Sequence, residues 1–181
     1  MAASRIEPLE DLLGPDRNYA DPAEFRRVLG HFATGVAAVT GIDGGAPIGL
    51  LVNSFTSVSL EPPLVAFCVA RTSGSWPRMR GARRHCICFL AADQREQARR
   101  LATPGSDKFR GLAWRPSPAG LPVLEGALAW IEGTVEAEYP AGDHVIVVTR
   151  VHRLARCEDA AEAGPLLFYR GSFERFGAPD E

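Results

Sequence analysis

Long apolar runs and the common enzyme signatures are both missing from this sequence of 181 residues. No stretch reaches the roughly 18 to 20 consecutive apolar residues that a membrane span needs, and residues 1–19 contain no apolar signal-peptide core. We therefore expect a cytoplasmic protein with no membrane segment. The length corresponds to about one domain, which can bury a core without disulfides or metals.

Lysine is nearly absent as well. The 20 basic residues include a single lysine, Lys108, and the net charge is −2. The arginines are spread along the chain and do not gather in a stripe with aromatic residues. Because such a stripe is typical of nucleic-acid-binding surfaces, we expect no nucleic-acid partner.

Four cysteines, Cys68, Cys86, Cys88 and Cys157, are too few and too scattered to indicate a disulfide framework. Cys86 and Cys88 fall within a predicted strand, and we expect their side chains to point to opposite faces of it. Buried free thiols are the favoured interpretation, ahead of a disulfide or a metal site. We expect no metal.

Two capping-box patterns predict helices. The first, Asp21 to Glu24, has Pro22 at the first helical position. An apolar stripe follows it, which predicts that the helix packs on the core by one face and stops at Gly35. The second pattern, Asp93 to Glu96, precedes a helix that ends at "TPGSDKF". The stripe consists of Phe25, Val28, Leu29 and Phe32.

Runs rich in β-branched residues predict the strands, and the first three form a meander with "GIDGGAP" as a hairpin turn. We see no repeat and no second domain. About six strands in antiparallel hairpins with two helices predict a small β-barrel, which closes its edges. The runs are residues 36–40, 48–52, 64–69, 86–90, 129–138, 144–154 and 165–169.

The sequence contains no nucleophile elbow, no P-loop, no His-x-x-x-His pair and no Rossmann glycine motif. Among its 4 histidines, His144 is the strongest candidate for chemistry. It follows Gly142 and Asp143 at the mouth of a predicted hairpin, where a side chain can lie over a pocket. The alternative is an ordinary polar residue at the end of a turn.

Two loops rich in small hydroxyl residues are candidate ligand contacts. "NSFTSVS", residues 53–59, lies between two apolar runs and suits a flat, uncharged, hydrogen-bonding ligand. "ARTSGSW", residues 70–76, adds a cation and a glycine, which are typical of a phosphate site. Each loop alone could be a surface turn. Together they indicate a phosphorylated aromatic ligand, and a flavin has this chemistry.

Several blocks of sequence resemble the flavin reductase-like domain family, the FMN-binding split barrels of two-component flavin monooxygenases. The resemblance extends over about residues 21–173, and the order and spacing of the blocks make it specific. The blocks are "FRRVLGHFATGVAAVT" (25–40), "PIGLLVNSFTSVSLEPPLV" (47–65), "SGSW" (73–76), "DKF" (107–109), "GDH" (142–144) and "PLLFYRG" (165–171).

The resemblance implies a mainly β fold, a six-stranded antiparallel split β-barrel with peripheral α-helices, which forms a homodimer. The domain would occupy residues 21–176, with an N-terminal tail or arm at 1–20 and a C-terminal tail at 177–181. The flavin, FMN or FAD, would lie along the strand ends and the loop between the second and third strands.

Site residues follow from the same resemblance. The isoalloxazine ring would be lined by Pro47, Ile48, Gly49, Leu50, Leu51, Asn53 and Ser54. The ribityl chain and phosphate would be contacted by Ala70, Arg71, Gly74 and Ser75. Arg100 would reach the phosphate or the adenylate half of FAD, with a solvated helix arginine as the alternative. Many members have Thr or Ala in place of Leu51, so only a backbone contact is expected there.

On the nicotinamide side the family pattern implies His144 as the catalytic histidine, together with Tyr169, Arg170, Gly171 and Ser172. The implied activity is hydride transfer from NADH or NADPH to FMN or FAD, with the reduced flavin passed to a separate oxygenase. An alternative is a non-enzymatic flavin-binding or flavin-carrying protein. A third interpretation is an interaction module with no ligand.

Overall fold

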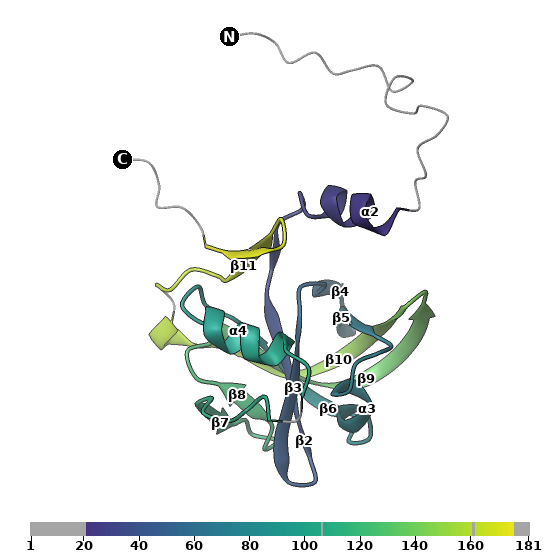
Figure 1. Ribbon diagram of the computed structural model, residues 1–181. Helices are drawn as coiled ribbons and strands as arrows, with labels where there is room; N and C mark the ends of the chain where they lie inside the picture. Colours follow the sequence, from purple (N-terminus) through teal and green to yellow (C-terminus); the bar gives the residue numbers. More distant parts are fainter. Residues whose placement is uncertain (1–20, 106, 161, 176–181) are drawn as a thin grey trace, which may run out of the picture.

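A computed structural model describes residues 21–105, 107–160 and 162–175 (Figure 1). The predicted tail or arm at residues 1–20 and the predicted tail at 177–181 lie outside the described residues. Within them the chain is built mainly from antiparallel strands, as the sequence predicts. None of the helices in the described ranges combines the length and apolarity needed to cross a membrane.

The main sheet has seven strands within the described residues, in the order β3-β2-β6-β9-β10-β5-β4, and every recorded pairing is antiparallel. Its strands are β2 (Ala37–Asp43), β3 (Ala46–Val52), β4 (Thr56–Leu60), β5 (Pro63–Ala70), β6 (Arg84–Phe89), β9 (Ala129–Ala141) and β10 (His144–Arg156).

Shorter elements surround this sheet. The small strands are β1 (Thr34–Gly35), β7 (Trp114–Pro116), β8 (Pro122–Leu124), β11 (Leu167–Tyr169) and β12 (Ser172–Glu174). The helices are α2 (Pro22–Leu29), α3 (Trp76–Arg80), α4 (Arg95–Ala102) and the short 3₁₀ helix η1 (Glu158–Ala160).

Two details of the predicted barrel are wrong. Residues Thr56–Leu60, read as part of a hydroxyl-rich loop, form strand β4 along β5, so the main sheet has seven strands. The predicted meander is also wrong, because β5 pairs with β4 and β10 instead of with β3. Within the described residues, β3 and β4 are the two ends of the sheet and do not pair with each other. The barrel is therefore open between β3 and β4, and we call this opening the seam.

Both faces of the central strands β2 and β6 are buried, and two apolar clusters result. Val39 and Ile87 point into the curled sheet, with Phe67. Cys86 and Cys88 point to the other side, under α4 and β8, with their Sγ atoms 4.0 Å apart. The prediction that these two side chains face opposite ways is wrong, because residues two apart in a strand share a face. Both thiols are free, as predicted.

Helix α2 begins as predicted, with the Asp21 carboxylate accepting a hydrogen bond from Ala23 N at 3.0 Å. The predicted length and packing are wrong. The helix ends at Leu29, and none of its residues is buried. Phe25 is 60% exposed and Phe32, just beyond the helix, 76%. Figure 1 shows α2 beyond the end of the main sheet, near β11, so its apolar stripe has no core to cover.

Helix α4 starts later than predicted and has a different cap. Its N-cap residue is Gln94, not Asp93, and the helix begins at Arg95. The Gln94 side chain makes no capping bond; instead it accepts from Ala91 N at 3.0 Å and donates to Glu125 O at 2.8 Å. The amide therefore joins the start of α4 to the chain that follows β8. The predicted end before "TPGSDKF" is confirmed.

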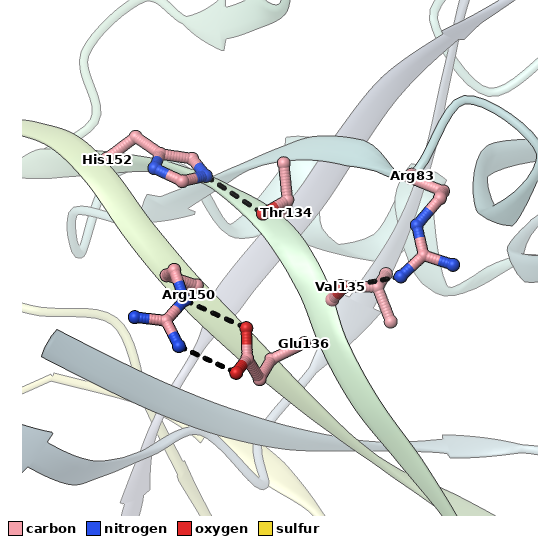
Figure 2. A network of polar contacts seen from close by, with 6 residues as sticks. All are labelled: Arg83, Thr134, Val135, Glu136, Arg150 and His152. Atoms are coloured by element: carbon pink, nitrogen blue, oxygen red, sulfur yellow. Dashed lines mark hydrogen bonds and ion pairs between the residues drawn. The ribbon is translucent and has the colours of Figure 1, made fainter. Parts of the chain in front are cut away.

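The hairpin β9–β10 carries a polar network along its strands (Figure 2). Arg150 forms a two-point ion pair with Glu136, with distances of 2.8 and 2.7 Å. Next to it, Thr134 Oγ1 lies 2.8 Å from His152 Nε2. Opposite charges on adjacent strands stabilise a pairing register. Because Thr134 lies on β9 and His152 on β10, their contact makes His152 part of the same cross-strand network.

Candidate functional site

The open edge of the main sheet borders a cavity of about 390 Å³, which we call the seam pocket. Leu50, Leu51 and Val52 of β3 all line it. Successive residues of a strand point to opposite faces, so three in a row can line one cavity only if it runs along the edge of the strand. The seam pocket therefore faces backbone groups of β3 that the sheet does not use.

The opposite wall of the seam pocket is the end of β5. Strand β4 pairs with β5 only as far as Ala66, while Cys68, Val69 and Ala70 line the cavity. Ser54 bridges the two walls: its Oγ accepts a hydrogen bond from Cys68 N at 2.8 Å and lies 3.3 Å from Cys68 O. The hydroxyl of Ser54 thus fixes the width of the seam, and exposed Asn53 beside it borders the cavity.

The third wall joins the loop after β5 to the turn of the β9–β10 hairpin. His144 is the register partner of Ala70. Arg71 N donates to Asp143 O at 2.9 Å, and Arg71 Nη1 donates to Gly142 O at 3.4 Å. These bonds bring His144 to the same pocket as Thr72, Ser73 and Gly74.

The ring of His144 is held by its neighbour in sequence. Asp143 Oδ1 lies 2.7 Å from His144 Nδ1. This hydrogen bond, and the charge of the imidazole, hold the pKa of the Asp143 carboxyl below its usual range. With Nδ1 donating to the carboxylate, Nε2 is the ring nitrogen left free to contact a ligand.

Lys108 supplies the cation of the seam pocket, and the site prediction missed it. Its Nζ donates to Leu101 O at 2.9 Å, and burial lowers the pKa of the ammonium. Of the described residues that line the seam pocket, none is acidic. The signal was present in the sequence, since Lys108 is the only lysine and lies in the "DKF" block.

The structure brings part of the predicted site together. The predicted residues that line the seam pocket are Leu50, Leu51, Asn53, Ser54, Ala70, Gly74 and His144. Lining residues outside the site prediction are Val52, Cys68, Val69, Thr72, Ser73, Leu101, Ala102, Pro104 and Lys108.

Other predicted residues lie close to the seam pocket without lining it. Pro47 and Ile48 precede the lining part of β3. A Cβ on buried Gly49 would lie 3.0 Å from Phe109 Cε2, so this glycine permits close packing of "DKF" on β3. Ser75 is buried at the start of α3. Arg100 donates to Arg110 O and pairs with Glu96 at 3.6 Å on the outer side of α4.

The predicted nicotinamide contacts Tyr169 to Ser172 form a separate cluster. They make the β11–β12 turn, in which Arg170 and Gly171 have φ values of 50° and 82°. Arg170 N donates to Gly30 O at 2.9 Å, and the Arg170 guanidinium lies 3.4 Å from His31 Nε2. Within one chain this cluster packs at the end of α2 and does not line the seam pocket.

The seam pocket combines three chemical properties. Strand edges offer backbone donors and acceptors in a row, hydroxyl groups of Thr72 and Ser73 lie at one end, and Lys108 adds positive charge. These groups match a flat ligand with a hydrogen-bonding rim and an attached anion. The volume is within the range of small-molecule sites.

Comparison with known proteins identifies relatives along most of the chain. The family model for the flavin reductase like domain matches residues 29–177. A flavin reductase from Pseudomonas putida is 46% identical over 164 residues, which cover 90% of this chain and 94% of that protein. The reductase subunit of a flavin-dependent monooxygenase from Mycobacterium tuberculosis is 41% identical, with 84% and 81% covered.

A solved structure agrees with these sequence matches. The NADH:FAD oxidoreductase of Streptomyces globisporus, in complex with NAD and FAD fragments, superposes with a TM-score of 0.80 at 37% identity. The superposition covers 88% of this chain and 94% of that one. The similarity therefore includes the strands that form the seam pocket as well as the family sequence blocks.

Proposed function

This chain belongs to the flavin reductase-like domain family, and we propose that it oxidises NADH or NADPH and reduces FMN or FAD. The reduced flavin would then pass to a separate oxygenase component. A relative that is the reductase subunit of a monooxygenase supports this role. A similar structure that holds NAD and FAD fragments supports the two nucleotide substrates.

The observation that carries the proposal is the seam pocket between β3 and β5. A flavin has a flat ring with donors and acceptors along its pyrimidine edge and a phosphate at the end of its side chain. Residues 50–52 and 68–70 line the cavity along strand edges, which fits the ring edge. Thr72, Ser73 and Lys108 would hold the phosphate. The residues present therefore fit a flavin.

The flavin and the nicotinamide supply the redox chemistry, a hydride transfer between two bound rings. The protein has to bind, orient and shield them. Backbone donors on the strand edges favour negative charge on the ring edge. His144, fixed by Asp143, would orient the nicotinamide through Nε2. This division of roles explains a site with few ionisable groups.

A homodimer is part of the proposal. The exposed stripe of α2 is a large apolar surface for a free monomer, and it lies beside the β11–β12 turn. A second copy that covers this stripe would also lie close to the turn formed by Tyr169 to Ser172, which packs at the end of α2. All four cysteines are free thiols, and two of them are buried, which fits a reducing compartment and supports a cytoplasmic location.

The test is nicotinamide oxidation, followed by the loss of NADH or NADPH absorbance, with FMN or FAD added to the purified chain. Flavin-dependent oxidation is expected with at least one pair. Absence of turnover with all four pairs, under oxygen-free conditions, would reject a reductase. Tight flavin binding without any nicotinamide oxidation would instead identify a flavin carrier.

A further inference from the structure

A second cavity, of about 340 Å³, lies directly next to the seam pocket. We call it the Trp76 pocket. It is formed by the loop after β5, helix α3 and the end of the β9–β10 hairpin. Its chemically informative lining residues are Arg71, Trp76, Arg80, Glu138, Pro140 and Val145. Ala70, Arg71 and Ser73 of this lining are also candidate flavin contacts, whereas Trp76, Arg80, Glu138, Pro140 and Val145 have no role in the proposed function.

The two cavities share one thin wall. Ala70 and Ser73 line both of them. On β10, His144 lines the seam pocket and the next residue, Val145, lines the Trp76 pocket. Successive strand residues point to opposite faces, so the cavities lie on the two sides of the same strand ends. A ligand longer than one nucleotide could therefore occupy both cavities by passing around the strand ends at Arg71.

Glu138 is fixed as an acceptor in the Trp76 pocket. Its Oε1 accepts from Trp76 Nε1 at 2.9 Å, and its Oε2 lies 2.7 Å from Arg80 Nε. The Glu138 side chain is 16% exposed, whereas that of Arg80 is 63% exposed. Each carboxylate oxygen has a further lone pair, so Glu138 can accept hydrogen bonds from ligand hydroxyls while its charge is balanced by Arg80.

Arg71 adds a positive charge at the rim. Its side chain makes one long hydrogen bond, 3.4 Å from Nη1 to Gly142 O, and is exposed. With Glu138 balanced by Arg80, the charge of Arg71 is left to attract an anion. Pro77, Pro140 and Val145 provide apolar surface on which a base can lie. A hydroxyl acceptor, a guanidinium and an apolar surface correspond to a ribose, a phosphate and a base.

We propose that the Trp76 pocket binds the adenosine monophosphate half of a dinucleotide whose other half occupies the seam pocket. This inference rests on the proposed function, because FAD and NAD(P)H are the two dinucleotides that such a reductase would bind. Both contain the same adenylate, and the kinetic test separates them.

Arg80→Gln is the variant to test, since Arg80 holds Glu138 and its exposed guanidinium can also meet the phosphate. Arg78→Gln is the matched control: it lies on the same helix and pairs with Asp43 at 2.8 Å, outside the cavity. A dinucleotide whose phosphate loses one hydrogen bond from a charged side chain binds about tenfold more weakly, and its KM rises by about the same factor. FMN lacks the adenylate, so its KM is expected to change less than twofold.

A rise in the KM for FAD but not for FMN places the flavin adenylate in the Trp76 pocket. A rise in the KM for NADH with FMN as acceptor places the nicotinamide adenylate there. Unchanged KM values for both dinucleotides overturn the proposal, and so does an equal rise for FMN and FAD.

Binding of 5′-AMP provides a readout that does not depend on turnover. If the wild-type chain oxidises no nicotinamide, the reductase proposal fails while the adenylate pocket remains testable. A rise in Tm with 5′-AMP that is lost in Arg80→Gln and kept in Arg78→Gln supports the pocket. No rise in the wild type overturns it.

Discussion

Asp143 Oδ1 and His144 Nδ1 lie 2.7 Å apart on successive residues at the turn of the β9–β10 hairpin. The same Asp143 accepts, through its backbone carbonyl, the hydrogen bond from Arg71 N at 2.9 Å. One residue thus orients the imidazole and anchors the loop that forms the neighbouring wall of the seam pocket.

His144→Ala is expected to lower kcat about 10- to 100-fold, because the nicotinamide loses its orienting contact. The Kd for flavin should change less than twofold. Asp143→Asn should give a smaller loss of kcat, since the ring remains and its hydrogen bond weakens. Stopped-flow rates of flavin reduction and flavin fluorescence titrations measure the two quantities.

His152→Ala is the control for His144, because that ring contacts Thr134 on the outer hairpin network (Figure 2). An equal loss of flavin affinity and of kcat in His144→Ala would show that His144 belongs to the flavin site instead.

Lys108→Met is expected to raise the Kd for FMN about tenfold, since the phosphate loses a charged partner. Burial lowers the pKa of Lys108, so its positive charge disappears at a lower pH than that of an exposed lysine. Wild-type FMN affinity should therefore fall as the pH rises toward that lowered pKa. Kd values measured from pH 7 upward test this, and the profile of Lys108→Met should be flat.

Arg110→Gln, an exposed cation on the same loop, serves as the control for Lys108. A similar loss of affinity in both variants would indicate a general effect of charge, and the assignment of Lys108 to the phosphate would be wrong.

Substitution of the α2 stripe is expected to dissociate the proposed homodimer. Phe32→Asp places a charge on a surface that a second copy would have to bury, while the side chain is 76% exposed within one chain. The wild type should sediment at twice the chain mass and Phe32→Asp at the chain mass. Arg27→Asp, on the polar side of α2, should remain dimeric; a wild-type monomer would refute the interface.

His85 is expected to make the fold sensitive to acid. It is buried against Phe67 and Trp76, its Nε2 lies 2.8 Å from Thr149 Oγ1, and burial lowers its pKa from 6.5 to about 4. Between these values the unfolded chain binds more protons, so the free energy of unfolding rises with pH. Burial of neutral His85 therefore makes the free energy of unfolding about 3 kcal/mol larger above pH 6.5 than below pH 4.

Urea unfolding of the wild type and of His85→Gln at several pH values measures this contribution. The free energy of unfolding of the wild type minus that of His85→Gln should increase from pH 4 to pH 6.5. Parallel stability curves for the wild type and the variant would show that His85 does not titrate as described.

Local sequence patterns, such as caps and apolar runs, predicted most of the helices and strands. They did not predict the contacts between segments that are distant in sequence. Asp21 and the apolar runs of β2, β3, β5, β6, β9 and β10 carry local signals, and those elements exist. Thr56–Leu60 is rich in hydroxyl residues and carries only the short alternation of Ser57 and Ser59 with Val58 and Leu60. Its pairing with β5 is a contact that this local pattern does not report. The stripe of α2 has the correct period, but periodicity alone does not say which surface will cover it.

The candidate site also combines residues that sequence blocks predicted with residues that only the fold brings together. Residues 50–54, Ala70, Gly74 and His144 fall on continuous sequence blocks, and the fold brings them to one pocket. Lys108 reaches the seam pocket only because the segment after α4 folds back over β3, close to Gly49. The Trp76 pocket depends on an approach between Arg80 and Glu138, which are distant in sequence.

The open seam has a consequence for handling the protein. An unpaired strand edge such as that of β3 is a template for the addition of another chain, and such edges promote aggregation. Pro47, which lacks a backbone N–H, blunts part of this edge, but residues 50–52 remain able to pair. A ligand in the seam covers that stretch. Those amide hydrogens of this stretch that point away from β2 should exchange slowly with solvent only while flavin is bound, and storage without flavin should favour precipitation.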